Sequence, residues 1–205
     1  MTGRGMGRGT TRLVVEIRRK AFGDHLVLRD LDFIVEAGET LAVLGPSGSG
    51  KSTLLRIVAG LDRDFEGRIG APAEIAMVFQ EPTLLPWRTA LQNLTLTTGV
   101  DAGRAASMLA EVGLAGREER FPRQLSLGQQ RRLALARAMV TRPRLLLLDE
   151  PFVSLDAPLV EEMLHLTERL IAEVRPASLF VTHAPAEARR LATRTLRLDQ
   201  PHALE

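Results

Sequence analysis

Short apolar segments along the chain show the residue spacing of β-strands. The segment 28–35 alternates apolar and polar residues, as a strand with one buried face does, although Ile34 interrupts the alternation. The segment 40–44 is nearly all apolar, which is typical of a strand covered on both faces. Further short strands are predicted at 13–17, 75–79, 145–149 and 178–182.

Helical periodicity follows several of these strands. A helix is predicted from Lys51 to about Gly60, directly after a glycine-rich turn. From about 84 to 140 the pattern is helical, most clearly at 105–112 and 128–140. Recurring strand–turn–helix units predict an α/β fold with a mostly parallel sheet and helices on both of its faces. We interpret the long helical stretch as an insertion into that fold.

The composition excludes several classes of protein. The 205 residues suit one domain, predicted over 12–205, with 45% hydrophobic and 25% charged residues. The absence of cysteine excludes disulfides, cysteine-ligated zinc and thiol catalysis. The net charge of +2 gives no case for a nucleic-acid partner. No apolar run approaches the roughly 18–20 residues of a membrane-spanning helix.

The two ends of the sequence have little regular pattern. Residues 1–11 are rich in Gly and Arg and lack an apolar core region, so we expect a disordered lead-in rather than a secretory signal. Residues 200–205 follow the last expected strand, so no regulatory domain is expected there.

Directly after the strand 40–44, the residues Gly45-Pro-Ser-Gly-Ser-Gly-Lys-Ser match the phosphate-loop pattern Gly-x4-Gly-Lys-Ser/Thr. Glycines let successive backbone N–H groups point inward, and the helix that begins at Lys51 adds the positive end of its dipole. Lys51 would neutralise the β- and γ-phosphates, and the hydroxyl of Ser52 would complete a Mg²⁺ shell. A flexible Gly/Ser turn is the alternative, but it does not explain the position between an apolar strand and a helix. The residues predicted to contact the nucleotide are Gly45, Pro46, Ser47, Gly48, Ser49, Gly50, Lys51, Ser52 and Thr53.

A second charged site is predicted where the strand 145–149 ends in two carboxylates. Ligands of open α/β sheets gather at the carboxyl ends of strands. Asp149 would therefore hold Mg²⁺ through water, and Glu150 would polarise the attacking water as a general base. A buried strand that ends in a solvated acidic turn is the alternative. The phosphate loop upstream favours the catalytic interpretation.

The chain resembles an ABC transporter ATPase over about residues 13–199. Its stretch Leu125-Ser-Leu-Gly-Gln is similar to the signature motif of that family, Leu-Ser-Gly-Gly-Gln, and stands before a predicted helix. In the family this motif binds the γ-phosphate of the ATP held by the partner subunit, which implies that role for Ser126, Gly128 and Gln129. Ser126 would also suit an ordinary helix N-cap. Leu127 replaces the first glycine, a change that requires a negative φ and room for the side chain.

The resemblance implies a P-loop NTPase fold, with a helical subdomain inserted at about 84–140 and an antiparallel β segment near the N-terminus. Gln80, after the strand 75–79, corresponds to the glutamine that senses Mg²⁺, the attacking water and the membrane subunit. His183 corresponds to the switch histidine that contacts the γ-phosphate, and residues 154–156 match the loop that crosses the dimer interface. The implied catalytic residues are Glu150, His183, Gln80 and Lys51, and the implied metal ligands are Ser52, Gln80 and Asp149.

Two positions near these motifs depart from the family or stay ambiguous. Phe22 stands where the family carries an aromatic residue that stacks on adenine, although it would also suit the core. The family usually has an acidic residue after the switch histidine, where this chain has Ala184. Glu187 keeps a carboxylate nearby.

The segment 77–89 resembles the ATPases of nitrate, sulfonate and taurine importers. Leu84, Leu85 and Trp87 form an apolar cluster where relatives receive a helix of the membrane subunit, unless they pack inside the helical lobe. The resemblance implies ATP and Mg²⁺ as cofactors, and as partners a separate permease, a second copy or related cassette, and a periplasmic or extracellular solute-binding protein. It also implies a peripheral location on the cytoplasmic side of the inner membrane. Two alternatives stay open: the ATPase of an exporter or lipid-handling system, and a soluble ABC ATPase without a transport function.

Overall fold

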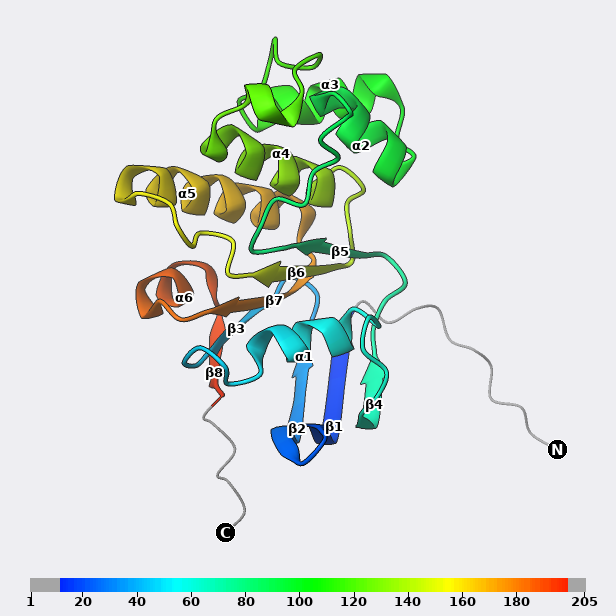
Figure 1. Ribbon diagram of the computed structural model, residues 1–205, viewed down its shortest axis with the longest axis vertical. Helices are drawn as coiled ribbons and strands as arrows, with labels where there is room; N and C mark the ends of the chain where they lie inside the picture. Colours follow the sequence, from blue (N-terminus) through cyan, green and yellow to red (C-terminus); the bar gives the residue numbers. More distant parts are fainter. Residues whose placement is uncertain (1–11, 199–205) are drawn as a thin grey trace, which may run out of the picture.

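The computed structural model describes residues 12–198 (Figure 1), so the disorder predicted for 1–11 lies outside the described residues. The strands in this range are β1 (Leu13–Phe22), β2 (His25–Val35), β3 (Thr40–Leu44), β4 (Glu66–Gly70), β5 (Ile75–Val78), β6 (Leu145–Asp149), β7 (Ala177–Thr182) and β8 (Arg194–Arg197). The helices are α1 (Lys51–Val58), α2 (Ala90–Thr98), α3 (Ala102–Glu111), α4 (Leu127–Met139), α5 (Ala157–Val174) and α6 (Pro185–Leu191), with a 3₁₀ turn at Pro122–Gln124. Across 12–198, no helix combines the length and the apolar character that crossing a bilayer requires.

A parallel sheet with the strand order β5-β6-β7-β3-β8 forms the centre of the molecule. Successive residues of its strands face opposite sides, so Leu145 and Leu147 join one core while Leu146 and Leu148 join the other. α1 and the antiparallel strands cover the first side, and α4 and α5 cover the second (Figure 1). Burial on both sides explains why these strands are almost continuously apolar.

A second, antiparallel sheet has the order β2-β1-β4. In β2, Phe33 and Val35 are buried, whereas Ile34 is 39% exposed and faces away from the core. β1 and β2 are longer than predicted because they pair along almost their whole length, out to Phe22 and His25. β4 was not predicted: it contains two glycines and has no buried residue, and its pairing with β1 makes it a strand.

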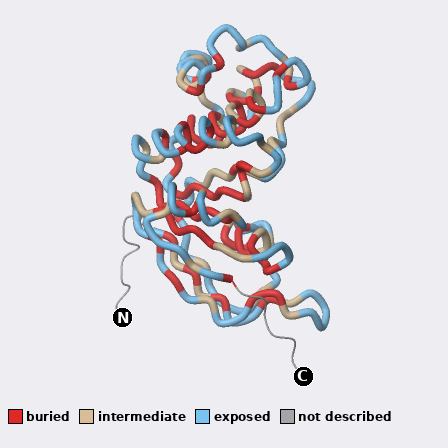
Figure 2. Tube along the Cα trace, turned by 90° about the vertical axis from the view of Figure 1, so that its left-hand side faces the viewer, coloured by how far each residue is buried: buried red, intermediate tan, exposed pale blue. Residues whose placement is uncertain are grey.

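Between β5 and β6 the chain forms α2, α3 and α4, which contact one another at the end of the molecule remote from the antiparallel sheet (Figure 1). Thr89, Asp101 and Ser126 cap these helices by accepting hydrogen bonds from backbone N–H groups of the first turn. α3 therefore begins earlier than predicted, directly after Asp101. Figure 2 shows exposed residues on the outer side of these helices and buried residues toward the rest of the molecule.

Candidate active site

The sequence-predicted functional loops gather at one edge of the parallel sheet. The strands β3, β5, β6 and β7 end there, and the loop 45–50, Gln80, Glu150 and His183 follow them. Because β6, β7 and β3 are neighbours, Glu150, His183 and Lys51 come together, whereas Gln80 follows the edge strand β5. Open α/β sheets bind their ligands at this edge.

The loop between β3 and α1 has the geometry of an anion site. Gly48 and Gly50 have φ angles of 82° and 93°, which other residues rarely adopt. α1 begins at Lys51 without a side-chain N-cap, whereas side chains cap α2, α3, α4 and α5. Its first backbone N–H groups can therefore bind an anion. The hydroxyl of Ser49 is buried and has no hydrogen-bond partner within 12–198.

Close packing requires glycine at both ends of this loop. A Cβ atom on Gly45 would lie 2.5 Å from the carbonyl oxygen of Leu198 and 2.6 Å from the hydroxyl of Ser49. A Cβ atom on Gly50 would lie 2.7 Å from the side chain of Leu28. The tip at Gly48 is open, so a ligand can reach the loop from that side.

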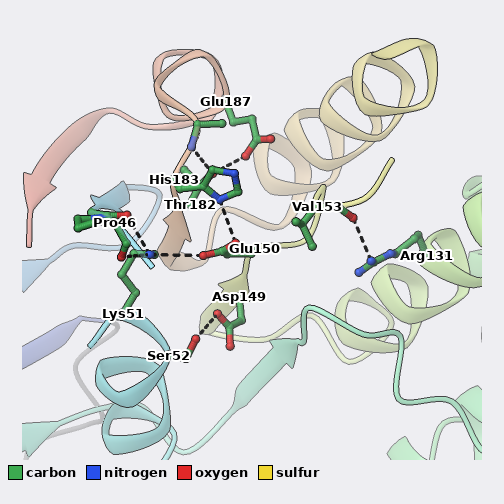
Figure 3. Close-up of polar contacts among 12 residues, drawn as sticks. Pro46, Lys51, Ser52, Arg131, Asp149, Glu150, Val153, Thr182, His183 and Glu187 are labelled. Atoms are coloured by element: carbon green, nitrogen blue, oxygen red, sulfur yellow. Dashed lines mark hydrogen bonds and ion pairs between the residues drawn. The ribbon is translucent and has the colours of Figure 1, made fainter. Parts of the chain in front are cut away.

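Lys51 and Ser52 point from the first turn of α1 toward the ends of β3 and β6 (Figure 3). The Lys51 side chain is only 4% exposed, and its Nζ donates hydrogen bonds of 2.9 Å to the carbonyl oxygens of Gly45 and Pro46. The hydroxyl of Ser52 donates to Asp149 Oδ1 at 3.0 Å. Burial raises the pKa of Asp149 above its ordinary value and Glu150 adds to this, although the hydrogen bond from Ser52 opposes it.

The carboxylate of Glu150 contacts both Lys51 and His183 (Figure 3). Its Oε1 lies 3.4 Å from Lys51 Nζ and its Oε2 lies 3.0 Å from His183 Nδ1. Its φ of 43° is unusual for a residue with a side chain and turns the chain directly at the end of β6. The imidazole of His183 is 54% exposed and therefore remains accessible to a ligand. A phosphate oxygen could replace the Glu150 carboxylate beside both groups.

A hydrogen-bond network behind His183 joins Glu187 to Thr182, a residue for which the sequence predicted no role. The hydroxyl of Thr182 donates to Glu187 Oε2 at 2.5 Å and accepts from the backbone N–H of Ala184 at 3.0 Å. Burial and the charge of Glu150 raise the pKa of the half-buried Glu187, although Thr182 and His183 oppose the shift. Thr182 thus links the carboxylate of Glu187 to Ala184, the position where the resemblance implies an acidic residue.

Comparison with known proteins shows the family of the chain. Residues 28–153, more than half of the chain, match the family described as ABC transporter. The chain belongs to the ABC transporter family. The aliphatic sulfonates import ATP-binding protein SsuB 2 of Rhodococcus jostii is 52% identical over 185 residues, which cover 88% of this chain and 76% of the relative. The protein of the same name from Rhizobium johnstonii is 50% identical over 192 residues, which cover 91% and 76%.

A solved ABC cassette has the same fold. The ATP-binding cassette MJ0796, in a dimeric post-hydrolysis state bound to ADP and Pi, superposes with a TM-score of 0.77 and 28% sequence identity. The match covers 93% of this chain and 97% of that one. The predicted family and the predicted P-loop NTPase fold are thereby confirmed. This chain is an ATP-binding subunit with the ATPase activity of the ABC transporter family.

The stretch that resembles the ABC signature motif lies away from the cluster around Lys51. Ser126 caps α4 in a capping box with Gln129, as its position before a helix predicted. Leu127 has a negative φ and is 46% exposed, so both conditions for replacing the glycine are met. A Cβ atom on Gly128 would lie 2.9 Å from Leu159, so this glycine lets α4 approach α5. Residues 126–129 and 154–156 line one concavity of about 680 Å³.

The remaining two predicted site residues, Phe22 and Gln80, lie outside the cluster around Lys51. Phe22 is 55% exposed at the β1–β2 hairpin, so it is not a core residue. The ammonium group of Lys20 lies 4.4 Å from the ring centroid of Phe22 and forms an ion pair with Asp62. Gln80 is exposed, and its carbonyl oxygen accepts a hydrogen bond from Arg131. Within the described part of the chain, neither Phe22 nor Gln80 forms a hydrogen bond or an ion pair with Lys51 or Glu150.

The apolar cluster after Gln80 splits into an inner and an outer part. Leu84 packs against the core, whereas Trp87 is 66% exposed. The buried side chain of Asn93 holds the turn that carries Trp87: it accepts from the N–H of Leu85 at 2.8 Å and donates to three backbone carbonyl groups, including that of Arg88 at 3.1 Å. This turn presents the tryptophan of the ABC subunit outward, so the alternative of interior packing fits Leu84 and not Trp87.

Proposed function

We propose that this ABC subunit hydrolyses ATP between two copies of the chain and thereby powers import through a separate membrane protein. The convergence of Lys51, Glu150 and His183 at one edge of the sheet carries the catalytic part of this proposal. The names of the relatives, which are import ATP-binding proteins, support the direction of transport.

The residues at the phosphate loop fit the triphosphate of ATP. The N-terminus of α1, the hydroxyl of Ser49 and the ammonium group of Lys51 are all donors, as a polyanion requires, and within residues 12–198 the Ser49 hydroxyl has no hydrogen-bond partner. The residues proposed to hold the triphosphate are Gly45, Pro46, Ser47, Gly48, Ser49, Gly50, Lys51, Ser52 and Thr53. We assign adenine stacking to the exposed face of Phe22, whose ring already lies against Lys20.

A magnesium ion fits the oxygen donors beside the phosphate loop. Ser52 Oγ and Asp149 Oδ1 are only 3.0 Å apart, and hydroxyl and carboxylate oxygens suit this cation. Gln80, from the loop after β5, would add an amide oxygen. When bound, the cation neutralises charge that develops on the phosphate oxygens.

Glu150 is the proposed general base. Its carboxylate accepts a proton from the water that attacks the γ-phosphorus, and the bond from that phosphorus to the ADP oxygen breaks. Lys51 and His183 stabilise the charge on the transferred group, because both face the position of the Glu150 carboxylate. ATP therefore has to displace Glu150 from these two side chains before hydrolysis.

A second copy of the chain completes the site in this proposal. The concavity at residues 126–129 is not lined by any residue of the phosphate loop that the structure describes. Ser126, Gly128 and Gln129 therefore need the nucleotide of another subunit to act on a γ-phosphate. The dimeric state of the solved cassette bound to ADP and Pi supports this arrangement.

The membrane partner is proposed to bind the helical part of the chain at 84–140. Exposed Trp87, which Asn93 holds in position, supports an interface beside Gln80. The chain would then lie peripherally on the cytoplasmic side of the membrane and would work with a separate solute-binding protein. An exporter would share the catalytic residues, but the names of the relatives favour import of an organic sulfonate.

The proposal is tested with the purified chain and with the chain assembled on its membrane subunits. Glu150→Gln should lower kcat by roughly a hundredfold or more without weakening ATP binding, because the base that accepts the proton is lost. Lys51→Ala should weaken ATP binding, whereas Glu173→Gln, on the exposed end of α5, should change neither. Proteoliposomes should take up an alkanesulfonate only with ATP and the wild-type chain. Unchanged turnover in Glu150→Gln contradicts the catalytic assignment, and ATP-driven efflux without uptake contradicts import.

A further inference from the structure

Arg131, in the second turn of α4, reaches two loops that lie far apart in the sequence. One Nη atom donates to the carbonyl oxygen of Gln80. The other donates to that of Val153 at 3.2 Å, the contact that Figure 3 shows. Gln80 follows β5, and Val153 directly precedes the loop 154–156 that follows β6. The guanidinium group of Arg131 thus joins α4 to the loop after β5 and to the loop after β6.

The environment of Arg131 is unusual for a cation. The residue is only 6% exposed, its Nε has no hydrogen-bond partner, and no ion pair to it occurs within 12–198. Burial lowers the pKa of Arg131, and only the charge of Glu81 opposes this shift. A buried cation without an ion-pair partner contributes little to stability. We therefore attribute the role of Arg131 to the relative positions of α4 and the two loops that its hydrogen bonds fix.

A second arginine of α4, Arg137, binds the segment after Gln80 at residues 82 and 83. Arg137 donates to the carbonyl oxygens of Pro82 at 3.1 Å and Thr83 at 2.9 Å, and to the hydroxyl of Thr83 at 3.0 Å. The segment 80–83 is therefore anchored to α4 at both of its ends. Any displacement of α4 has to carry Gln80 with it unless these bonds break.

We propose that Arg131 is a positioning residue that makes Gln80 and the loop 154–156 follow the N-terminal end of α4. This inference rests on the proposed function, in which Ser126 meets the nucleotide of the second copy. Contact at Ser126 moves α4, and Arg131 transmits that movement to the carbonyl group of Gln80 and to the residue before Ser154. The partner's nucleotide thereby sets the position of a loop that the hydrolytic site needs.

The first test separates positioning from nucleotide binding. Arg131→Met keeps an unbranched apolar stem but removes the guanidinium group and both donated bonds, and Arg131→Lys keeps the charge but cannot span two carbonyl groups. Both should lower kcat roughly ten- to a hundredfold, since misplacement by about 1 Å has that effect, while KM for ATP stays within about twofold. Arg142→Met removes an arginine whose side chain is 62% exposed and should leave kcat and KM unchanged.

The second test measures whether the effects of Arg131 and Ser126 on kcat are coupled. Ser126→Ala should lower kcat in the wild-type background but much less in the Arg131→Lys background, a non-additivity of about threefold or more. When Ser126→Ala is combined with Arg142→Met, the fold-changes of the two single variants in kcat should multiply. A purely structural role of Arg131 would instead give multiplying effects in both backgrounds.

Several results would overturn the inference. The first is a wild-type kcat in both Arg131 variants. The second is a loss of ATP affinity together with kcat in these variants. The third is that the fold-changes of Ser126→Ala and Arg131→Lys in kcat multiply in the double variant. If Arg131→Met does not fold, as judged by circular dichroism, the same criteria apply to Arg131→Lys. Failure of the proposed function appears separately, as absent hydrolysis by the wild type or normal hydrolysis by Glu150→Gln.

Discussion

The carboxylate of Glu150 lies 3.4 Å from the ammonium group of Lys51, while its other oxygen lies 3.0 Å from His183. The carboxylate of the proposed general base thus contacts both of the side chains that would contact a γ-phosphate. In the proposed mechanism, the γ-phosphate of ATP takes the place of the Glu150 carboxylate at Lys51 and His183, and this exchange releases the carboxylate for water. The same contact therefore connects nucleotide binding to the availability of the base.

This exchange predicts a difference between ATP and ADP. Glu150→Gln removes the competing charge, so ATP should bind up to about tenfold more tightly, which corresponds to about 1.4 kcal/mol. ADP lacks the γ-phosphate and should bind with unchanged affinity. Titration calorimetry with Mg²⁺ and each nucleotide measures both effects. Glu187→Gln removes a nearby negative charge without touching Lys51 and serves as the control; an equal gain there would show a general charge effect.

Gly45 is predicted to tolerate no side chain. In Gly45→Ala the new Cβ would approach the carbonyl oxygen of Leu198 to 2.5 Å, and a backbone atom cannot rotate away. The free energy of unfolding should fall by about 1–3 kcal/mol, measured by denaturant titration. The matched control is Gly70→Ala, where the nearest atom, on Val14, is 3.5 Å away. Equal stability of the two variants would contradict the crowding argument.

Glu187 is predicted to make stability depend on pH. Because the pKa of Glu187 is raised in the folded chain, that state binds more protons than the unfolded one between the ordinary and the raised value. The free energy of unfolding should therefore fall as the pH rises through this window and then level off. Glu187→Gln keeps an oxygen acceptor for Thr182 and lacks the charge.

The measurement compares unfolding of the wild type and Glu187→Gln between about pH 4 and pH 8. The variant should gain stability relative to the wild type as the pH rises, with the smallest difference at the acidic end. Glu173→Gln, on the exposed end of α5, should show no such trend. A difference that grows toward acidic pH would show that the pKa of Glu187 is lowered instead.

The sequence alone determined the features that short stretches of chain encode. The glycine-rich turn, the apolar strands and the capping residue Ser126 follow from local sterics, hydrophobic burial and hydrogen bonding. Because strands that alternate with helices form a parallel sheet, the sequence placed Lys51, Asp149 and Glu150 at the carboxyl ends of strands. The site role of His183 followed from the family resemblance.

Tertiary structure decided what depends on partners distant in the sequence. β4 is a strand because β1 lies beside it, and Phe22 is exposed because the hairpin projects from the core. No local signal distinguishes Arg131 from the other arginines, since its burial and its two acceptors arise only when α4 packs on two loops. The pairing of Thr182 with Glu187 likewise needs the turn between β7 and α6. Spacing along the chain specifies which residues can meet, and packing specifies which side chains lose water and find a partner.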